Sequence, residues 1–501
     1  MIAGQAGLVD HLRTRLAEHP SLSRGALVLL AVAVGLAGGY AIASWPFTLL
    51  GGLAGLLTIV AIISDPWYGL GATVLVVTLL PFGVLPFPVA GFQLTFLDAS
   101  LTLTLVLWFV RAVLGPHERL HVSPVGAFVA VYIGVCIVAF ANGLAYGVPA
   151  ANLRLFFRSV NGVLLFFGAL NCVRAAKDGE RLLALLVGGA AVAGAVGIAI
   201  YQLPQETAID VLSGLEPLGY PSGPDVLRFN AESGQLRAIG TAIDPNAFGA
   251  MLMVGGVVAV AQLLAARSWL RRLAFATALA PIVTALLLSL SRTSWVGFAA
   301  GLAFAVAVRY RRYWYAFLAL AGAVGLGLLA GGEQYLERLP VLGSFVGHLM
   351  TGLRVEDLAT MMRLGEYKDA LRLIAAYPWL GVGYGGNAPS VDLYVGVSSL
   401  YLLLGEYAGL LGVGAFLLAA LALFWYVMPP MWRAREGRLA GRMLGCLAAV
   451  FAALVAGIAD HPFINISFAH LTALFWLCAG LATALRRLPD AGTGAEPSAE
   501  V

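Results

Sequence analysis

The feature that most limits the fold is a series of long apolar segments running through almost the whole chain. About fourteen such runs occur, beginning near residues 26, 47, 69, 95, 124, 155, 181, 245, 273, 293, 314, 399, 441 and 464. A helix needs about 20 apolar residues to cross the hydrocarbon core of a bilayer, and some of these runs are shorter. We therefore predict an all-α, polytopic transmembrane helix bundle of about 12–14 spans.

Composition supports a membrane protein. Of the 501 residues, 60% are hydrophobic and only 11% are charged. A water-soluble domain of this length needs far more charge, so the lipid bilayer must be the solvent for most of the chain. The net charge of +4 does not indicate nucleic acid, because the basic residues sit in short loops between apolar runs. The four cysteines lie inside apolar runs and indicate neither a disulfide framework nor a metal site.

The basic loops give a predicted orientation. Arginine and lysine gather in alternate loops, which the positive-inside rule assigns to the cytoplasm. Both termini are then cytoplasmic, with an N-terminal segment at 1–24, a transmembrane domain at 25–485 and a disordered tail at 486–501. Two loops on the periplasmic side are unusually long, at about 201–244 and 331–398. Long loops often carry function.

Several arginines lie on the periplasmic side, against the usual charge bias. The basic residues there are Arg154, Arg158, Arg228, Arg237, Arg292, Arg338, Arg354, Arg363, Lys368 and Arg372. Because cations on this side oppose insertion, we expect some of them to bind an anion. Arginine grips phosphate with two parallel N–H donors, so a lipid with a phosphate or diphosphate head group would suit this face.

Three of these arginines are candidate substrate-binding residues. Arg237 precedes a predicted helix start, where Asp244 is the cap and Pro245 occupies the first turn. Arg292 lies in the tight turn of "LSLSRTSW" between two apolar runs, where a cation is hard to leave unpaired. Arg158 is a further candidate.

The second long loop contains a predicted amphipathic helix that starts near Arg363. Its expected apolar face is made by Leu364, Tyr367, Leu371 and Ile374, with the charges on the opposite face. Pro378 should end this helix, and the glycine-rich stretch "GVGYGGN" should follow as a flexible turn. The chain then re-enters the membrane with Glu406, an acid at a depth where it is either a structural partner or a catalytic group.

Four motifs in this order resemble the core of the O-antigen ligase and O-antigen polymerase superfamily. They are "RAIGTAIDPN", "LSLSRTSW", "RLGEYKDALRLIAAYPWLGVGYGGN" and "LYLLLGEYAGLLG", and they cover about residues 237–412. The resemblance implies a glycosyltransferase of the bacterial inner membrane that needs no metal or other cofactor. It implies transfer of a glycan from an undecaprenyl diphosphate carrier to an acceptor glycan or glycolipid at the periplasmic face. It also implies diphosphate-binding roles for Arg237, Arg292 and Arg363.

The general base is not given by the resemblance. Many ligases of this family have a His-Asn pair just before the re-entering helix, where this chain has Ser398-Ser399. The difference favours a polymerase over a ligase. Candidate catalytic residues on the periplasmic side are His461, which follows Asp460, and also Glu366 and Glu406, with His348 as a weaker alternative.

Two other classes of function stay open from the sequence. A transporter or flippase of lipid-linked oligosaccharide would use the same arginines to bind a head group. It would also need charged residues along a pathway near the midplane, where this chain has few. A purely structural membrane partner of an envelope-synthesis complex would need none of the periplasmic arginines.

Overall fold

The computed structural model of the chain describes residues 46–85, 93–114, 120–230, 233–309, 358–385, 396–433 and 438–488, and the single positions 315, 319 and 322. The described part is almost entirely α-helical, which confirms the predicted all-α polytopic bundle. Several predicted features lie outside the described residues. These are segment 1–24, Arg338, His348, Arg354 and tail residues 489–501.

The second of two compact units begins at Asp65, and its described residues form thirteen α-helices. They are α4 (Pro66–Leu79), α5 (Phe96–Leu114), α6 (Pro124–Gly143), α7 (Ala150–Cys172), α8 (Ala176–Gln202), α9 (Gln205–Ser213), α10 (Pro245–Ala265), α11 (Trp269–Leu288), α12 (Arg292–Arg309), α16 (Leu358–Ala376), α17 (Leu400–Arg433), α18 (Arg438–Ala456) and α19 (Ala469–Arg487). Helix α3 (Pro46–Ser64) belongs to the first unit.

Nine helices in the described ranges are long and apolar enough to cross a membrane. The chain is therefore a multi-pass membrane protein. Two shorter apolar helices, at Gly52–Ser64 and Pro66–Leu79, fall below the length of a full span. The runs near residues 26 and 314 are outside the described ranges, so the total of 12–14 spans stays a prediction.

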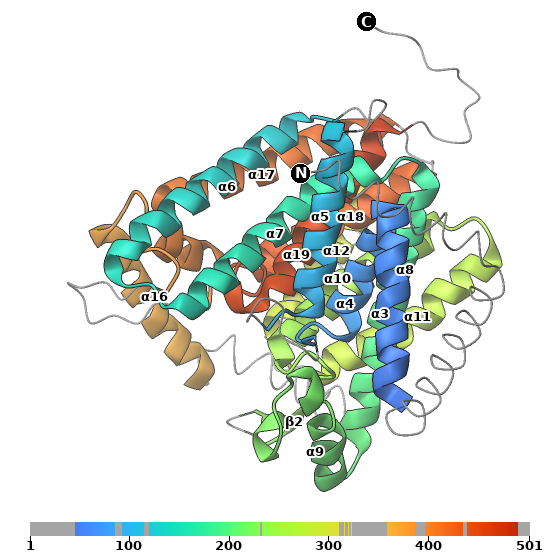
Figure 1. The fold of residues 1–501 in the computed structure, drawn as a ribbon, viewed down its shortest axis with the longest axis horizontal. Helices are drawn as coiled ribbons and strands as arrows, with labels where there is room; N and C mark the ends of the chain where they lie inside the picture. Colours follow the sequence, from blue (N-terminus) through green and yellow to red (C-terminus); the bar gives the residue numbers. More distant parts are fainter. Residues whose placement is uncertain are drawn as a thin grey trace, which may run out of the picture. The chain divides into compact units, whose positions relative to one another are not determined.

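The helices differ in how much of their surface is inside the protein. The apolar windows of α10, α18 and α19 are 83%, 83% and 94% buried, so these helices form the centre of the second unit. The windows of α5 and α11 are only 28% and 17% buried, and their apolar surfaces face outward, where lipid would lie. Around the centre, α7 packs along α19, α6 packs along α17, and both α10 and α12 pack on α18 (Figure 1).

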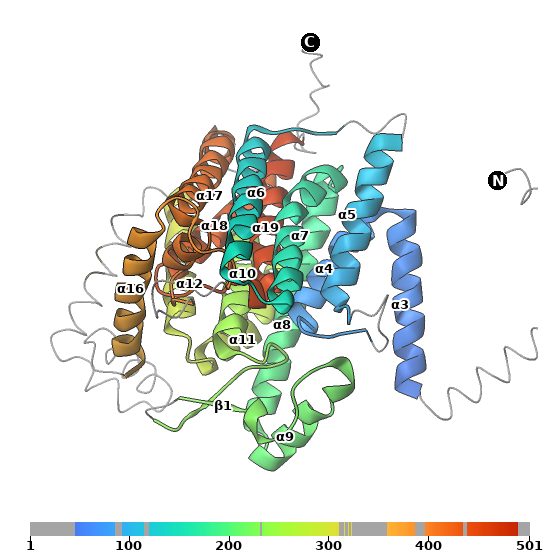
Figure 2. The ribbon, with the colours of Figure 1, turned by 60° about the vertical axis from the view of Figure 1, so that its left-hand side comes forward.

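The first of the two long loops forms a compact cap. After α8 it contains α9, the 3₁₀ turns η2 (Glu216–Leu218) and η3 (Pro224–Val226), and an antiparallel pair of short strands, β1 (Arg228–Phe229) and β2 (Leu236–Arg237). A small apolar cluster that includes Ala208, Leu212 and Val226 fills its interior. The cap lies at one end of the bundle, at the bottom of Figures 1 and 2.

Helix α17 is broken at Gly409, and the glycine-rich segment of the second loop fills the break. Gly409 has φ 63° and ψ −166°, a conformation open essentially to glycine alone. Val382 N–H donates to the Glu406 carbonyl at 2.8 Å, and Leu410 N–H donates to the Pro378 carbonyl at 2.7 Å. The predicted flexible turn is thus wrong for 381–385, because these residues satisfy backbone groups that the broken helix leaves open.

Helix α16 is present as predicted, but its buried face agrees only partly with the expected one. Leu364 and Leu371 are 44% and 57% exposed, whereas Ala370 and Leu373 are buried. This face is rotated so that Arg363, like Ala370, lies on the side that meets α17. The prediction is therefore wrong for the two leucines, whereas Tyr367 packs against the core and Ile374 is half-buried, as predicted. Figure 2 shows α16 beside α17.

The break in α17 predicts a sharp difference between two glycines of the same helix. In Gly409→Ala a Cβ would lie 2.3 Å from the Trp379 carbonyl carbon at a positive φ, so the variant should lose at least about 2 kcal/mol of stability. Gly414→Ala is the matched control, because its Cβ meets nothing within 4 Å and alanine favours the helix. Thermal unfolding in detergent checks this, and equal midpoints for the two variants would contradict the described break.

Candidate functional site

The Arg237 side chain is held at the junction of the cap and the bundle. Backbone N–H of Ala238 donates to the Leu288 carbonyl at 2.9 Å, which fixes β2 against the end of α11. The guanidinium donates from Nε to the Ser289 carbonyl at 2.9 Å and from Nη2 to Asn246 Oδ1 at 2.7 Å. Its Nη1 group donates no hydrogen bond to the described part of the chain. Two N–H donors of a positioned arginine are therefore left for a ligand.

The surroundings of Arg237 are partly dehydrated. The pKa of Arg237 is lowered to about 10, mainly by burial; the positive charges of Arg363 and Arg292 act in the same direction, and the negative charges of Asp244 and Asp460 oppose the change. The residue remains charged at neutral pH. These five charged groups are thus close enough to influence one another, although they come from β2, α12, α16, the start of α10 and the loop after α18.

Two residues other than glycine, Ile243 and Leu290, have a positive φ near Arg237. Ile243 has φ 63° just before the Asp244 cap of α10, and Leu290 has φ 51° in the turn between α11 and α12. A left-handed conformation is costly for such side chains, by about 1–3 kcal/mol each, and it persists only where surrounding contacts impose it. Here the Leu290 turn directs the Ser289 carbonyl to Arg237. Such strain is concentrated at functional sites in proteins.

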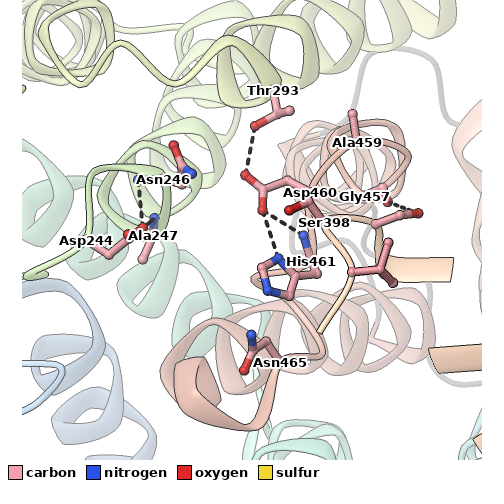
Figure 3. Close-up of polar contacts among 12 residues, drawn as sticks. Asp244, Asn246, Ala247, Thr293, Ser398, Gly457, Ala459, Asp460, His461 and Asn465 are labelled. Carbon is pink, nitrogen blue, oxygen red and sulfur yellow. Dashed lines mark hydrogen bonds and ion pairs between the residues drawn. The ribbon is translucent and has the colours of Figure 1, made fainter. Parts of the chain in front are cut away.

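The predicted start of α10 is confirmed. The Asp244 carboxylate accepts hydrogen bonds from the backbone N–H groups of Asn246 and Ala247, both at 2.8 Å (Figure 3). Burial raises the pKa of Asp244, and the N–H donors and Arg237 partly offset this effect. The cap therefore does two things: it begins the helix, and it places Asn246 where its side chain accepts from Arg237.

Asp460 and His461 form a hydrogen-bonded pair between α18 and α19. Asp460 Oδ1 lies 3.1 Å from His461 Nδ1 and accepts from the His461 backbone N–H at 2.8 Å. Its other oxygen, Oδ2, accepts from the Thr293 hydroxyl of α12 at 3.1 Å (Figure 3). Asp460 is only 4% exposed. His461 Nε2 makes no hydrogen bond to the described part of the chain, so it is the ring nitrogen that can meet a ligand.

The buried Asp460 carboxylate is ionised. Burial alone would raise the pKa of Asp460, but the hydrogen bonds and charge of His461, together with the charge of Arg363, lower it below the usual value. Arg363 approaches from α16 and donates from Nη1 to the Ala459 carbonyl at 3.0 Å. The structure therefore brings Arg237, Arg292 and Arg363 into one region with Asp460. Among the five charged groups around Arg237, three are guanidinium groups and two are carboxylates.

Glu366 and Glu406 both hold the segment that precedes α17. Glu366 Oε2 accepts from the Ser398 backbone N–H at 3.0 Å, and Glu406 Oε2 accepts from the Gly396 N–H at 3.0 Å. Ser398 is also the acceptor, through its carbonyl, for the Tyr367 hydroxyl at 3.2 Å. His461 lies close enough to Glu406 for their charges to interact. Glu406 therefore adjoins the histidine, Glu366 lies close enough to Glu406 for their charges to interact, and both acids accept hydrogen bonds from backbone N–H groups.

Arg158 has a different environment. It lies on α7 and forms a two-pronged ion pair with Asp98 of α5, at 2.6 Å and 2.7 Å. Both carboxylate oxygens of Asp98 accept hydrogen bonds from the guanidinium, so the pair of N–H donors with which Arg158 could grip a phosphate is already used. The electrostatic group around Arg237 does not include it.

Comparison with known proteins finds a family match within this core. Residues 276–401 match the profile of the O-antigen ligase family. This part of the chain is therefore similar to an O-antigen ligase domain. No curated protein matches the chain. The match supports the O-antigen ligase and polymerase superfamily and a glycosyl-transferring membrane enzyme in the broad sense.

The O-antigen ligase domain contains only part of the candidate site. Arg292, Arg363 and Glu366 lie within the matched residues. Arg237 lies before the match, and Glu406 and His461 lie after it. The fold brings these residues close to the matched segment. Arg237 comes from the cap, and His461 comes from the loop after α18.

Several contacting groups were missed from the sequence. Thr293 directly follows Arg292, but nothing local shows that its hydroxyl meets Asp460, which is 167 positions away. Asn246 sits in the "DPN" helix start, a signal of capping rather than of contact with an arginine. The carbonyls of Ser289, Leu290 and Ala459 carry no side-chain signal at all.

Removing the Thr293 hydroxyl should destabilise the protein by about 1–3 kcal/mol, because a buried carboxylate then loses a donor. Thr293→Val keeps the shape, whereas Thr293→Ser keeps the donor and serves as the control. Folding lowers the pKa of Asp460, so the ionised carboxylate stabilises the folded protein fully above its unfolded pKa of about 3.9. This stabilisation is lost as the pH falls through the lower pKa of the folded state. Thermal unfolding at neutral pH checks this, and a valine variant as stable as wild type would show that Thr293 does not support Asp460.

Proposed function

We propose that this protein moves a glycan from an undecaprenyl diphosphate-linked donor to a saccharide or lipid-saccharide acceptor at the periplasmic face of the bacterial inner membrane. The O-antigen ligase domain supports the broad class of reaction. The observation that carries the proposal is the meeting of three arginines, with Nη1 of Arg237 left as a donor, beside an Asp-His pair. In this account the cap and the Asp460 loop are both periplasmic.

The arginines are proposed to bind the diphosphate. A diphosphate needs several positive donors that are already in place, since its charge increases as the bond to the sugar breaks. Arg237 is held by two backbone carbonyls and by Asn246, so it loses little freedom when a ligand binds. Arg292 and Arg363 add charge from α12 and α16. Because its fork is filled by Asp98, Arg158 is proposed to contribute to substrate binding only through its positive charge and not by direct contact with the diphosphate.

His461 is proposed as the general base. The acceptor hydroxyl transfers its proton to His461 Nε2 as its oxygen forms a bond to the anomeric carbon of the donor glycan. The bond from that carbon to the diphosphate oxygen breaks, and its electrons leave with the undecaprenyl diphosphate. Asp460 accepts from Nδ1–H, which selects the tautomer with a free Nε2 and stabilises the imidazolium that forms.

Glu366 and Glu406 are proposed to position the site rather than to take the proton. Each has a carboxylate oxygen bound to backbone N–H groups of 396–398. This segment leads to Leu400, whose N–H donates to the Gly457 and Asp460 carbonyls at 2.8 Å and 3.0 Å. Loss of either acid should then displace the loop that bears His461.

We favour a polymerase over a ligase, because Ser398-Ser399 replaces the family's His-Asn pair. The glycolipid profile of a deletion strain tests this assignment. Loss of long chains with single repeat units retained supports a polymerase, whereas full-length chains stranded on the carrier identify a ligase. Carrier-linked glycan held on the cytoplasmic side would instead indicate a flippase and would contradict the proposed transfer.

Lysine should not replace arginine at the diphosphate. Arg292→Lys and Arg237→Lys keep the charge but lose the planar fork, so each should reduce transfer about tenfold to more than a hundredfold, equivalent to about 1.5–3 kcal/mol. Arg372→Lys is the control, since Arg372 on α16 is 71% exposed and, among the described residues, pairs with Asp369 three positions earlier. Glycan transfer at equal expression is the measurement. Wild-type rates in both lysine variants would mean that neither arginine binds the donor.

A further inference from the structure

The turn that carries His461 also presents an asparagine with an unused hydrogen-bond donor. Between α18 and α19, the backbone N–H groups of Ile464 and Asn465 both donate to the His461 carbonyl, at 3.2 Å and 3.0 Å. The chain therefore folds back on itself here and places Asn465 beside His461. We call residues 461–465 the His461 turn.

The His461 turn is anchored in the protein by apolar side chains. Phe463 and Ile464 are buried, and so is Ile466, which directly follows the turn. The Phe463 ring also lies against Phe475 of α19, with the two ring centroids 6.2 Å apart. Polar side chains on this turn are therefore held in place before a substrate binds, so they lose little freedom when it does.

The amide of Asn465 has a fixed orientation. Its Oδ1 accepts a hydrogen bond from the Ser467 backbone N–H at 2.9 Å, at the start of the 3₁₀ turn η6 (Ile466–Phe468). Only the oxygen of an amide can accept from an N–H group, so the other end is the nitrogen. Nδ2 donates no hydrogen bond to the described part of the chain, and Asn465 is half-buried. Its N–H donors are thus available to a ligand.

The free nitrogen of Asn465 lies on the reactive side of His461. Figure 3 shows the nitrogen end of the amide turned toward the edge of the His461 ring that carries Nε2, away from Asp460. Asp460 holds the other ring nitrogen, Nδ1, at 3.1 Å. A proton acceptor, Nε2, and a neutral donor, Nδ2, therefore face the same space.

These two groups match two neighbouring oxygens of a sugar ring. In the proposed transfer, Nε2 takes the proton of the acceptor hydroxyl, so the acceptor ring lies against this edge of His461. Oxygens on adjacent carbons of a sugar ring are close together, so the second oxygen comes within reach of Nδ2. A neutral amide suits a neutral hydroxyl or acylamino oxygen. The diphosphate is instead served by the arginines of β2, α12 and α16.

We propose that Asn465 binds the acceptor glycan, by donating from Nδ2 to the oxygen next to the attacking hydroxyl. The inference rests on the proposed function and adds to it the class of acceptor. That class is a sugar with a hydroxyl or acylamino group on the carbon adjacent to the one that carries the attacking hydroxyl. Asn465 holds this hydroxyl at Nε2, so it is a positioning and specificity residue rather than the base.

Initial rates with donor and acceptor varied separately test the role of Asn465. The full-length protein is purified in detergent and supplied with a labelled undecaprenyl diphosphate-linked glycan and the glycolipid acceptor that accumulates in a deletion strain. Asn465→Ser keeps an oxygen that accepts from the Ser467 N–H but removes the amide donor. It should raise the acceptor KM about three- to tenfold, as expected for one lost hydrogen bond. The donor KM and the unfolding temperature should not change.

Ser467→Ala is the matched control, because exposed Ser467 gives only its backbone N–H to Asn465 and alanine keeps that group. Asn465→Thr repeats the test if the serine variant unfolds, since threonine can also accept the Ser467 N–H. Three results would overturn the inference while the proposed function stands: an unchanged acceptor KM in the folded variant, an equal rise in the donor KM, or an equal rise in Ser467→Ala. Absence of product with wild type would overturn the proposed function and this inference together.

Discussion

The candidate site depends on one buried carboxylate. Asp460 lies in a membrane protein, 4% exposed, and it stays ionised because its surroundings supply a hydroxyl, two donors from His461 and the charge of Arg363. Each of these partners comes from a different part of the chain, so the carboxylate fixes α12, α16 and the loop after α18 relative to one another. An uncompensated charge at this position would be far more costly than any single contact in the site. The rest of the geometry follows from meeting that requirement.

Much of the framework could be predicted from the sequence, because lipid imposes strong rules on it. Long apolar runs predict spans, and the "DPN" signal predicts the start of α10, where Asp244 is the cap. The three motif arginines converge as their order implied. The wrong predictions have a common cause: they concern residues whose structure is set by contacts with distant segments of the chain. Residues 381–385 look flexible until they fill the break in α17, and α16 turns away from its leucines because Arg363 and Glu366 have partners on the protein side.

The proposed glycan-transfer site depends on an arginine that is positioned before a ligand arrives. Arg237 is half-buried, and its Nη1 donates no hydrogen bond to the described part of the chain. Where water is scarce, such a group favours an anion that arrives with its own apolar tail. His461 adds a ring nitrogen beside the arginines, so the same site can also take up a proton.

The most direct measurement separates donor binding from transfer. Purified wild type and His461→Ala are supplied with a labelled undecaprenyl diphosphate-linked glycan and an acceptor, and bound donor and product are quantified in parallel. The account predicts that the alanine variant binds the donor as wild type does, because Arg237, Arg292 and Arg363 still hold the diphosphate, while product formation falls at least about a hundredfold. Transfer at the wild-type rate in His461→Ala would contradict the central claim that the Asp460–His461 pair activates the acceptor.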